Sequence, residues 1–118
     1  MNALLGIWMV MSAEMGGKDI TAMFANERME MKQNAYSILS GNIVIDSGTL
    51  LIDENAGEID IVGTEGPNKG KQFKCIYKMK GDRLIICYSL GDRPTAFATD
   101  ASHQLVLITL TKANVSLQ

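Results

Sequence analysis

The chain contains one histidine, His103, which directly follows Ser102 and lies three residues after Asp100. These are the three residue types of a serine-hydrolase triad, in which the histidine takes the proton of the serine hydroxyl and the acid orients the histidine. Sequence neighbours in one loop rarely converge in that geometry, although a distant serine such as Ser12 could approach His103 from another strand. The simpler interpretation, which we favour, is a solvated loop histidine.

Glu14 is the acidic residue whose position has most chemical interest. Alternation of side chains along a strand places Ser12 and Glu14 on the same face as Trp8. If Trp8 points inward, Glu14 is an inward carboxylate that would bind an amine or act as a general base. If the strand has left the interior by that point, Glu14 is solvated. We therefore commit to no catalytic residue and keep Glu14, His103 and Ser12 as candidates.

Two cysteines, Cys75 and Cys87, are too few for a disulfide scaffold. Neither neighbours a histidine or a helix start that would lower the thiol pKa, so we expect buried, unreactive thiols rather than a nucleophile. The glycine-rich segment 66–71 has the wrong spacing for a phosphate-binding loop and precedes a strand instead of a helix. No Cys/His cluster of zinc type is present. The sequence predicts neither a metal nor a cofactor.

The composition of the chain limits the classes of protein to which it can belong. The 118 residues correspond to one domain, 1–118, and a hydrophobic fraction of 47% is enough to build a core. A net charge of -2 excludes a strong attraction to nucleic acid. The longest uncharged run, residues 1–13, is shorter than the roughly 20 residues of a membrane span and lacks the basic start of a signal peptide. We expect a cytoplasmic or processed soluble protein.

Apolar and polar residues alternate with a period of two through most of the chain, a pattern typical of strands. One short helix is expected at Asp19–Ala25, with Asp19 as its N-cap. Eight or nine short strands with almost no helix indicate an antiparallel barrel or sandwich. The expected strands are 5–15, 27–33, 35–40, 42–46, 49–53, 58–63, 71–80, 82–90 and 105–111, followed by a frayed tail over 113–118.

Two hairpins have registers that the side-chain pattern predicts. Pairing Asp60 with Ile76 sets Glu58 opposite Lys78 on the outer face. In the next hairpin, a two-residue turn at 80–81 places the apolar residues of both strands on the inner face. In that register Cys75 points inward and Cys87 outward, so the two thiols do not form a disulfide.

Gly6-Ile7-Trp8 matches the Gly-x-Trp pattern that opens the first strand of lipocalins. Further matching pieces are Gly48-Thr49, Thr64–Lys71, Tyr77, Gly81–Leu84, Arg93–Phe97 and Leu105–Lys112. Over residues 5–112 the chain resembles a bacterial family of small lipocalin-like domains, mostly of unknown function, with a calycin-type β-barrel. The resemblance implies about eight antiparallel strands, a barrel open or plugged at one end, and no catalytic residue. It also implies that Trp8 plugs the closed end with Arg93 on its face, the alternative being a Trp8 that stacks on a ligand.

Methionines gather in the first quarter of the chain: Met1, Met9, Met11, Met15, Met23, Met29 and Met31. Methionine fills irregular gaps and suits adaptable binding surfaces. The cluster therefore indicates plain core, a cavity mouth, or a surface of the first strand through which copies of the chain form a homo-oligomer.

The predicted fold is all-β, a small antiparallel lipocalin-like barrel of about eight strands with one short helix. The preferred function is binding of a small apolar or amphipathic ligand inside the barrel, with the hydroxyls of Tyr77 and Tyr88 orienting it. The alternatives are a small hydrolase or proton-transfer enzyme that uses the cavity, and a structural self-associating module. The predicted pocket walls are Ile59, Ile61, Phe73, Cys75, Tyr77, Ile86 and Tyr88.

Overall fold

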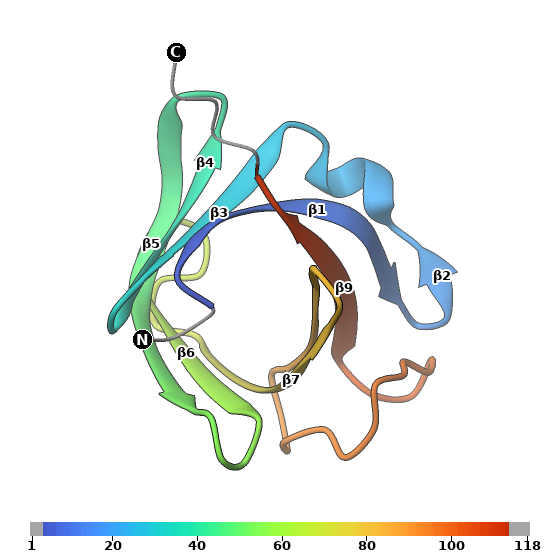
Figure 1. The fold of residues 1–118 in the computed structure, drawn as a ribbon. Helices are drawn as coiled ribbons and strands as arrows, with labels where there is room; N and C mark the ends of the chain where they lie inside the picture. The colour runs from blue at the N-terminus through green and yellow to red at the C-terminus, as the bar shows by residue number, and fades with distance from the viewer. Residues whose placement is uncertain (1–3, 114–118) are drawn as a thin grey trace.

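The computed structural model describes residues 4–113, which form a closed antiparallel barrel (Figure 1). Eight strands follow one another around the barrel in sequence order, and β1 closes it by pairing with β9. The short strand β2 extends β1 as a hairpin. The elements are β1 Gly6–Met15, β2 Lys18–Asp19, η1 Thr21–Phe24, β3 Glu27–Lys32, β4 Ala35–Ser40, β5 Ile43–Asp53, β6 Glu58–Glu65, β7 Gln72–Lys80, β8 Arg83–Ser89 and β9 Leu105–Lys112.

This architecture confirms the predicted all-β barrel of about eight strands, and it is compatible with a calycin or lipocalin-like fold. The predicted helix at Asp19–Ala25 is wrong in type, because the structure has a 3-10 turn there, at Thr21–Phe24. Asp19 does serve this turn, since its carboxylate accepts a hydrogen bond of 2.8 Å from the backbone N–H of Thr21. Of the expected frayed tail, residues 114–118 lie outside the described residues, while Ala113 donates its N–H to Ile7 O at 2.7 Å.

Residues 42–46 and 49–53 belong to one strand, β5, rather than two. Gly48, expected at a turn, lies inside this strand with a backbone conformation any residue could adopt. A Cβ at this position would lie 2.0 Å from Val62 O and 2.7 Å from Tyr36 Cε2. Glycine is therefore needed there for close strand packing, which the sequence pattern cannot distinguish from a turn.

One end of the barrel is filled by Trp8, whose side chain is 1% exposed. Its indole N–H donates to Leu4 O at 2.9 Å, and the Nζ of Lys112 lies 5.0 Å from the ring centroid. Because β1 begins and β9 ends at this level, we call it the closed end. The cation on the Trp8 ring is thus Lys112, and Arg93 has a different position described below.

The barrel interior next to Trp8, away from the closed end, is packed with side chains. Ile59, Cys75 and Ile86 have no exposed surface, so no water-sized cavity touches them. Together with these three residues, the core includes apolar side chains from all eight barrel strands; others are Trp8, Met29, Met31, Tyr36, Leu50, Ile61, Leu84, Ile108 and Leu110. The middle of the barrel is consequently a core rather than an empty vessel.

The predicted β6–β7 register is wrong by two residues, since Glu58 lies opposite Ile76 and not Lys78. The turn is shorter than expected because the segment after β6 folds back on it. The N–H of Gly63 donates to Lys71 O at 3.0 Å, and the N–H of Gly70 donates to Gly63 O at 2.9 Å. A slip of two residues keeps every side chain on its predicted face.

The β7–β8 register is also shifted by two residues. The turn residues are Gly81 and Asp82 instead of residues 80–81, and Gly81 has φ +64°, which suits the first position of a two-residue hairpin turn. Faces are again preserved. Cys75 points inward and Cys87 outward, and both are free thiols, as predicted.

A β-bulge in β1 decides between the two orientations considered for Glu14, and it also sets the orientation of Ser12. The pairing of β1 with β9 shifts between Val10 and Ser12, so that one extra residue, Met11, is inserted. An inserted residue reverses the alternation that follows it. Ala13 therefore points inward with 3% exposure, whereas Ser12 and Glu14 lie on the outer face.

Candidate ligand-binding site

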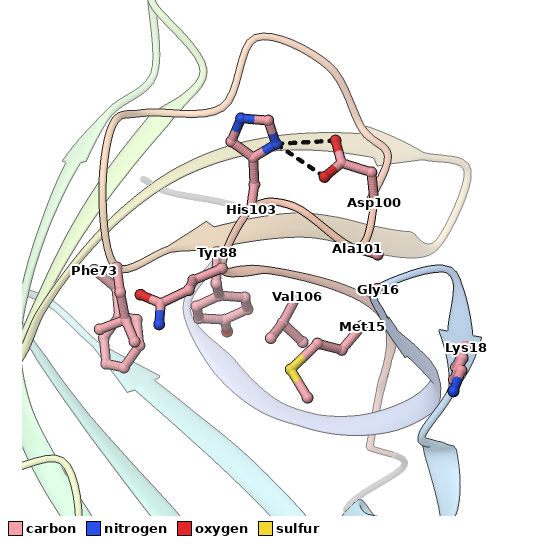
Figure 2. A pocket seen from close by; sticks show the side chains of 11 residues that line it. Met15, Gly16, Lys18, Phe73, Tyr88, Asp100, Ala101, His103 and Val106 are labelled. Carbon is pink, nitrogen blue, oxygen red and sulfur yellow. Dashed lines mark hydrogen bonds and ion pairs between the residues drawn. The ribbon is translucent and has the colours of Figure 1, made fainter.

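A pocket of about 430 Å³ lies at the end of the barrel remote from Trp8, which we call the open end. Figure 2 shows the side chains that line it. This volume falls within the range of small-molecule sites. The wall is mainly apolar, and polar side chains stand around it. The apolar residues are Met15, Phe73, Tyr88, Leu90 and Val106, and the polar ones are Lys18, Asp100, His103 and Gln104.

The barrel strands place the apolar wall by simple alternation. Phe73 begins the inward face of β7, Tyr88 ends that of β8, and Val106 begins that of β9. The rings of Phe73 and Tyr88 meet edge to face, with centroids 6.2 Å apart. Met15 reaches the pocket because of the bulge in β1. Without the bulge, Glu14 would occupy that inward position, so the bulge places a thioether where uninterrupted alternation would have placed a carboxylate.

Of the seven predicted wall residues, Phe73 and Tyr88 line this pocket. Ile59, Ile61, Cys75 and Ile86 are instead packed in the core. Tyr77 lies toward the closed end, where its N–H donates to Gly57 O at 2.9 Å. Burial, followed by the charges of Glu54 and Asp53, raises the pKa of its hydroxyl.

Sequence reasoning missed Leu90, Val106 and Gln104 as lining residues, because all three lie at or beyond strand ends. Val106 carried a usable signal, since it alternates with Ile108 and Leu110 on the inward face of β9. Leu90 and Gln104 belong to the loop between β8 and β9, and nothing in their spacing predicts the pocket.

The hydroxyl of Tyr88 has an unusual partner, the Sδ atom of Met29 at 3.7 Å. Burial raises the pKa of this hydroxyl, so it carries its proton at neutral pH. By contrast, the buried hydroxyl of Tyr36 donates to the carboxylate of Asp46 at 3.1 Å.

Asp46 itself is a buried carboxyl, 5% exposed, that sequence reasoning missed. Besides Tyr36, it accepts hydrogen bonds from the side-chain amide of Asn68 at 2.9 Å and from the Asn68 backbone N–H at 3.3 Å. These bonds tie the glycine-rich segment 66–71 to the barrel. The segment is thereby fixed by Asp46 and serves the fold.

His103, Ser102 and Asp100 are in contact, but not in the geometry of a catalytic triad. His103 Nδ1 lies 2.9 and 3.1 Å from the two carboxylate oxygens of Asp100, and 3.1 Å from Ser102 Oγ. A triad requires the acid on one ring nitrogen and the serine on the other. Here both contact Nδ1, and Ser102 Oγ also donates to Asp100 at 2.8 Å. The three residues form an exposed hydrogen-bonded turn. Of these, His103 and Asp100 line the pocket (Figure 2).

This turn makes a testable electrostatic prediction. Hydrogen bonds from His103, and then from Ser102, lower the pKa of Asp100 to about 2. We expect His103→Ala to raise the pKa of Asp100 toward the ordinary aspartate value, because the largest stabiliser of the carboxylate is lost. Carboxyl ¹³C NMR during a pH titration measures the change.

Ser102→Ala is the matched control for that titration. It removes the hydroxyl but keeps the backbone N–H bond to Asp100 (2.9 Å), so its effect on the pKa should be smaller. A lowered pKa also means that the contribution of Asp100 to stability is present at neutral pH and is lost as the pH falls toward 2. An Asp100 pKa that stays near 2 in the His103 variant would refute the assignment.

Arg93 anchors the β8–β9 loop to the outside of the barrel instead of covering Trp8. Its guanidinium donates to Asp60 at 2.6 Å and to Cys75 O at 2.9 Å. The hydrogen bond to Asp60 raises the pKa of Arg93. The Thr99 hydroxyl adds a second anchor by donating to Glu14 at 2.5 Å. Glu14 thus helps to hold the loop that carries the polar pocket rim.

The same loop covers Cys87, which points outward yet has no exposed surface. Its Sγ lies 3.8 Å from Ala98 O, and burial raises the pKa of the thiol. Burial likewise raises the pKa of the Cys75 thiol to about 12. Neither thiol has the lowered pKa of a nucleophile at neutral pH.

Comparisons with protein-family models, with curated proteins and with solved structures found no match. Within residues 4–113, no helix has the length and apolar character to cross a membrane. In the same range, no group of three or more His, Cys, Asp or Glu side chains is arranged to hold a metal ion.

Proposed function

We propose that this protein binds a small apolar or amphipathic molecule in the open-end pocket. One observation carries the proposal. The barrel interior is packed with side chains from Trp8 to its middle, but at the open end mainly apolar side chains line a pocket of about 430 Å³. Transferring apolar surface from water into such a site is favourable by about 25 cal/mol per Å². A closed eight-stranded barrel can hold one small ligand, which supports the same function.

The distribution of polar groups favours a definite orientation of the ligand. Its apolar body would pack between Phe73, Tyr88 and Val106. Any strongly polar or charged end would remain at the rim, near Lys18 and His103, where solvent can hydrate it. Asp100 contributes little to that end of the ligand, because His103 and Ser102 already occupy its carboxylate.

Titration with Nile red, an uncharged apolar dye, tests the proposal. We expect saturable binding of one dye per chain. Leu90→Glu should weaken it by about tenfold or more, because it places a charge against the apolar wall. Leu51→Glu is the matched control, since Leu51 is an exposed leucine that does not line the pocket. Absence of saturable binding, or equal weakening by both variants, would contradict the proposal.

A second candidate function, self-association, rests on the outer face of β1. Met9 and Met11 are 46% and 41% exposed there, an apolar surface that a second copy could cover. Sedimentation velocity over a range of concentrations tests this role. A strict monomer at all concentrations would rule it out, and association lost in a Met9→Lys variant would support it.

A further inference from the structure

The hydroxyl of Tyr88 lacks a strong hydrogen-bond partner. Within the described chain its partner is the thioether of Met29 at 3.7 Å, and thioether sulfur is a weak acceptor. Buried tyrosine hydroxyls ordinarily find an oxygen or nitrogen partner, as Tyr36 does with Asp46. Tyr88 therefore holds a strong donor at a place where the protein supplies only a weak acceptor.

The position of this donor relates it to the pocket. The Tyr88 ring lines the pocket wall next to Val106, and its hydroxyl points away from the His103 turn (Figure 2). A molecule that enters past the rim and packs on Val106 and Met15 therefore approaches the hydroxyl.

Charge decides which acceptor is suitable. The charged residues that line the pocket, Lys18 and Asp100, are both exposed. The groups that affect the Tyr88 hydroxyl electrostatically are Cys75 and Tyr36, and burial keeps both protonated at neutral pH. A carboxylate placed at this depth would lose its hydration without gaining a counter-ion. An uncharged oxygen loses far less.

We infer that Tyr88 determines ligand specificity by donating its O–H to an uncharged oxygen acceptor of the bound molecule, in place of the Met29 sulfur. The ligand class is an apolar molecule that carries a ketone, ester or ether oxygen on its buried part, in preference to a fatty-acid anion. This inference rests on the proposed function of the open-end pocket. A neutral hydrogen bond of this kind changes affinity by about three- to tenfold.

The test compares 2-octanone, octane and octanoate as competitors of Nile red. We expect Tyr88→Phe to lower the affinity for 2-octanone by about three- to tenfold and to leave the affinity for octane unchanged. Tyr77→Phe is the matched control, because Tyr77 does not line the pocket. This variant should change neither the affinity for 2-octanone nor the affinity for octane. We also expect octanoate to bind the unmodified protein more weakly than 2-octanone.

Each outcome separates this inference from the proposal beneath it. If none of the three compounds competes with the dye, the proposed function fails as well. If octane and 2-octanone compete but Tyr88→Phe affects them equally, or if octanoate binds more tightly than 2-octanone, only the inference fails. Because Tyr88→Phe alters a residue that packs against the core, the ¹³Cζ resonance of Tyr88 in the unmodified protein gives a second readout. It should shift more with 2-octanone than with octane, and equal shifts would overturn the inference.

Discussion

Replacing Trp8 with alanine is expected to lower the free energy of unfolding by about 3–5 kcal/mol. The side chain is 1% exposed and fills the closed end of the barrel. Truncation removes its apolar contacts, its hydrogen bond to Leu4 O and its contact with the ammonium of Lys112. The surrounding strands are paired on both sides, so they cannot collapse into the space that is left. Urea unfolding followed by far-UV circular dichroism measures the change without relying on Trp8 fluorescence.

Met23→Ala is the control, because it shortens a large apolar side chain that is not packed in the core. Met23 is 68% exposed, so its truncation should change the free energy of unfolding by less than about 0.5 kcal/mol. A loss below about 1 kcal/mol for Trp8→Ala would show that Trp8 does not fill the closed end as described.

Gly48→Ala is expected to cost about 3 kcal/mol, the upper part of the usual range for overpacking. The added Cβ would lie 2.0 Å from the backbone oxygen of Val62, and 2.9 Å from its carbonyl carbon. Backbone atoms in a paired strand cannot move aside as a flexible side-chain end can. The same Cβ would press on the Tyr36 ring and so disturb the bond from Tyr36 to Asp46.

Gly91→Ala provides the matched comparison, measured by the same urea unfolding. Gly91 has an ordinary backbone conformation, and the nearest atom to an added Cβ is Ser89 Oγ at 4.0 Å. We expect this variant to be neutral or slightly more stable, since alanine restricts the unfolded chain. Equal losses in both variants would mean that the close approach at Gly48 is not responsible.

Hydrophobic alternation was sufficient to predict the barrel and, outside the bulge in β1, the inward or outward face of the strand side chains discussed above. Cys75 and Cys87 illustrate this, because a register error of two residues left their orientations correct. Register itself depends on the turn conformation. The bonds of Gly63 with Lys71 and Gly70, and the positive φ of Gly81, set it, and neither follows from the apolar pattern.

The errors about the site arose where local geometry departs from a regular strand. A bulge at Met11 has no clear signature in a run that is apolar on both faces, and it reversed Glu14 and Met15. The predicted plug contact failed for another reason: Arg93 and Lys112 are both cations, and long-range packing decided which one meets Trp8. Where the strands are regular, alternation predicted the inward side chains, but it could not distinguish a packed level of the barrel from a level that holds a pocket.

Methionine methyl NMR tests the central claim most directly, because methionines lie both inside and outside the proposed site. With [¹³C-methyl]methionine in the protein, titration with 2-octanone should shift the Met15 resonance in the pocket wall and leave Met9 and Met11 on the outer face unchanged. The Met29 resonance should shift as well, because its sulfur loses the Tyr88 hydrogen bond. If only Met9, Met11 or Met23 responds, or if no resonance moves at saturating 2-octanone, the open-end pocket is not a binding site.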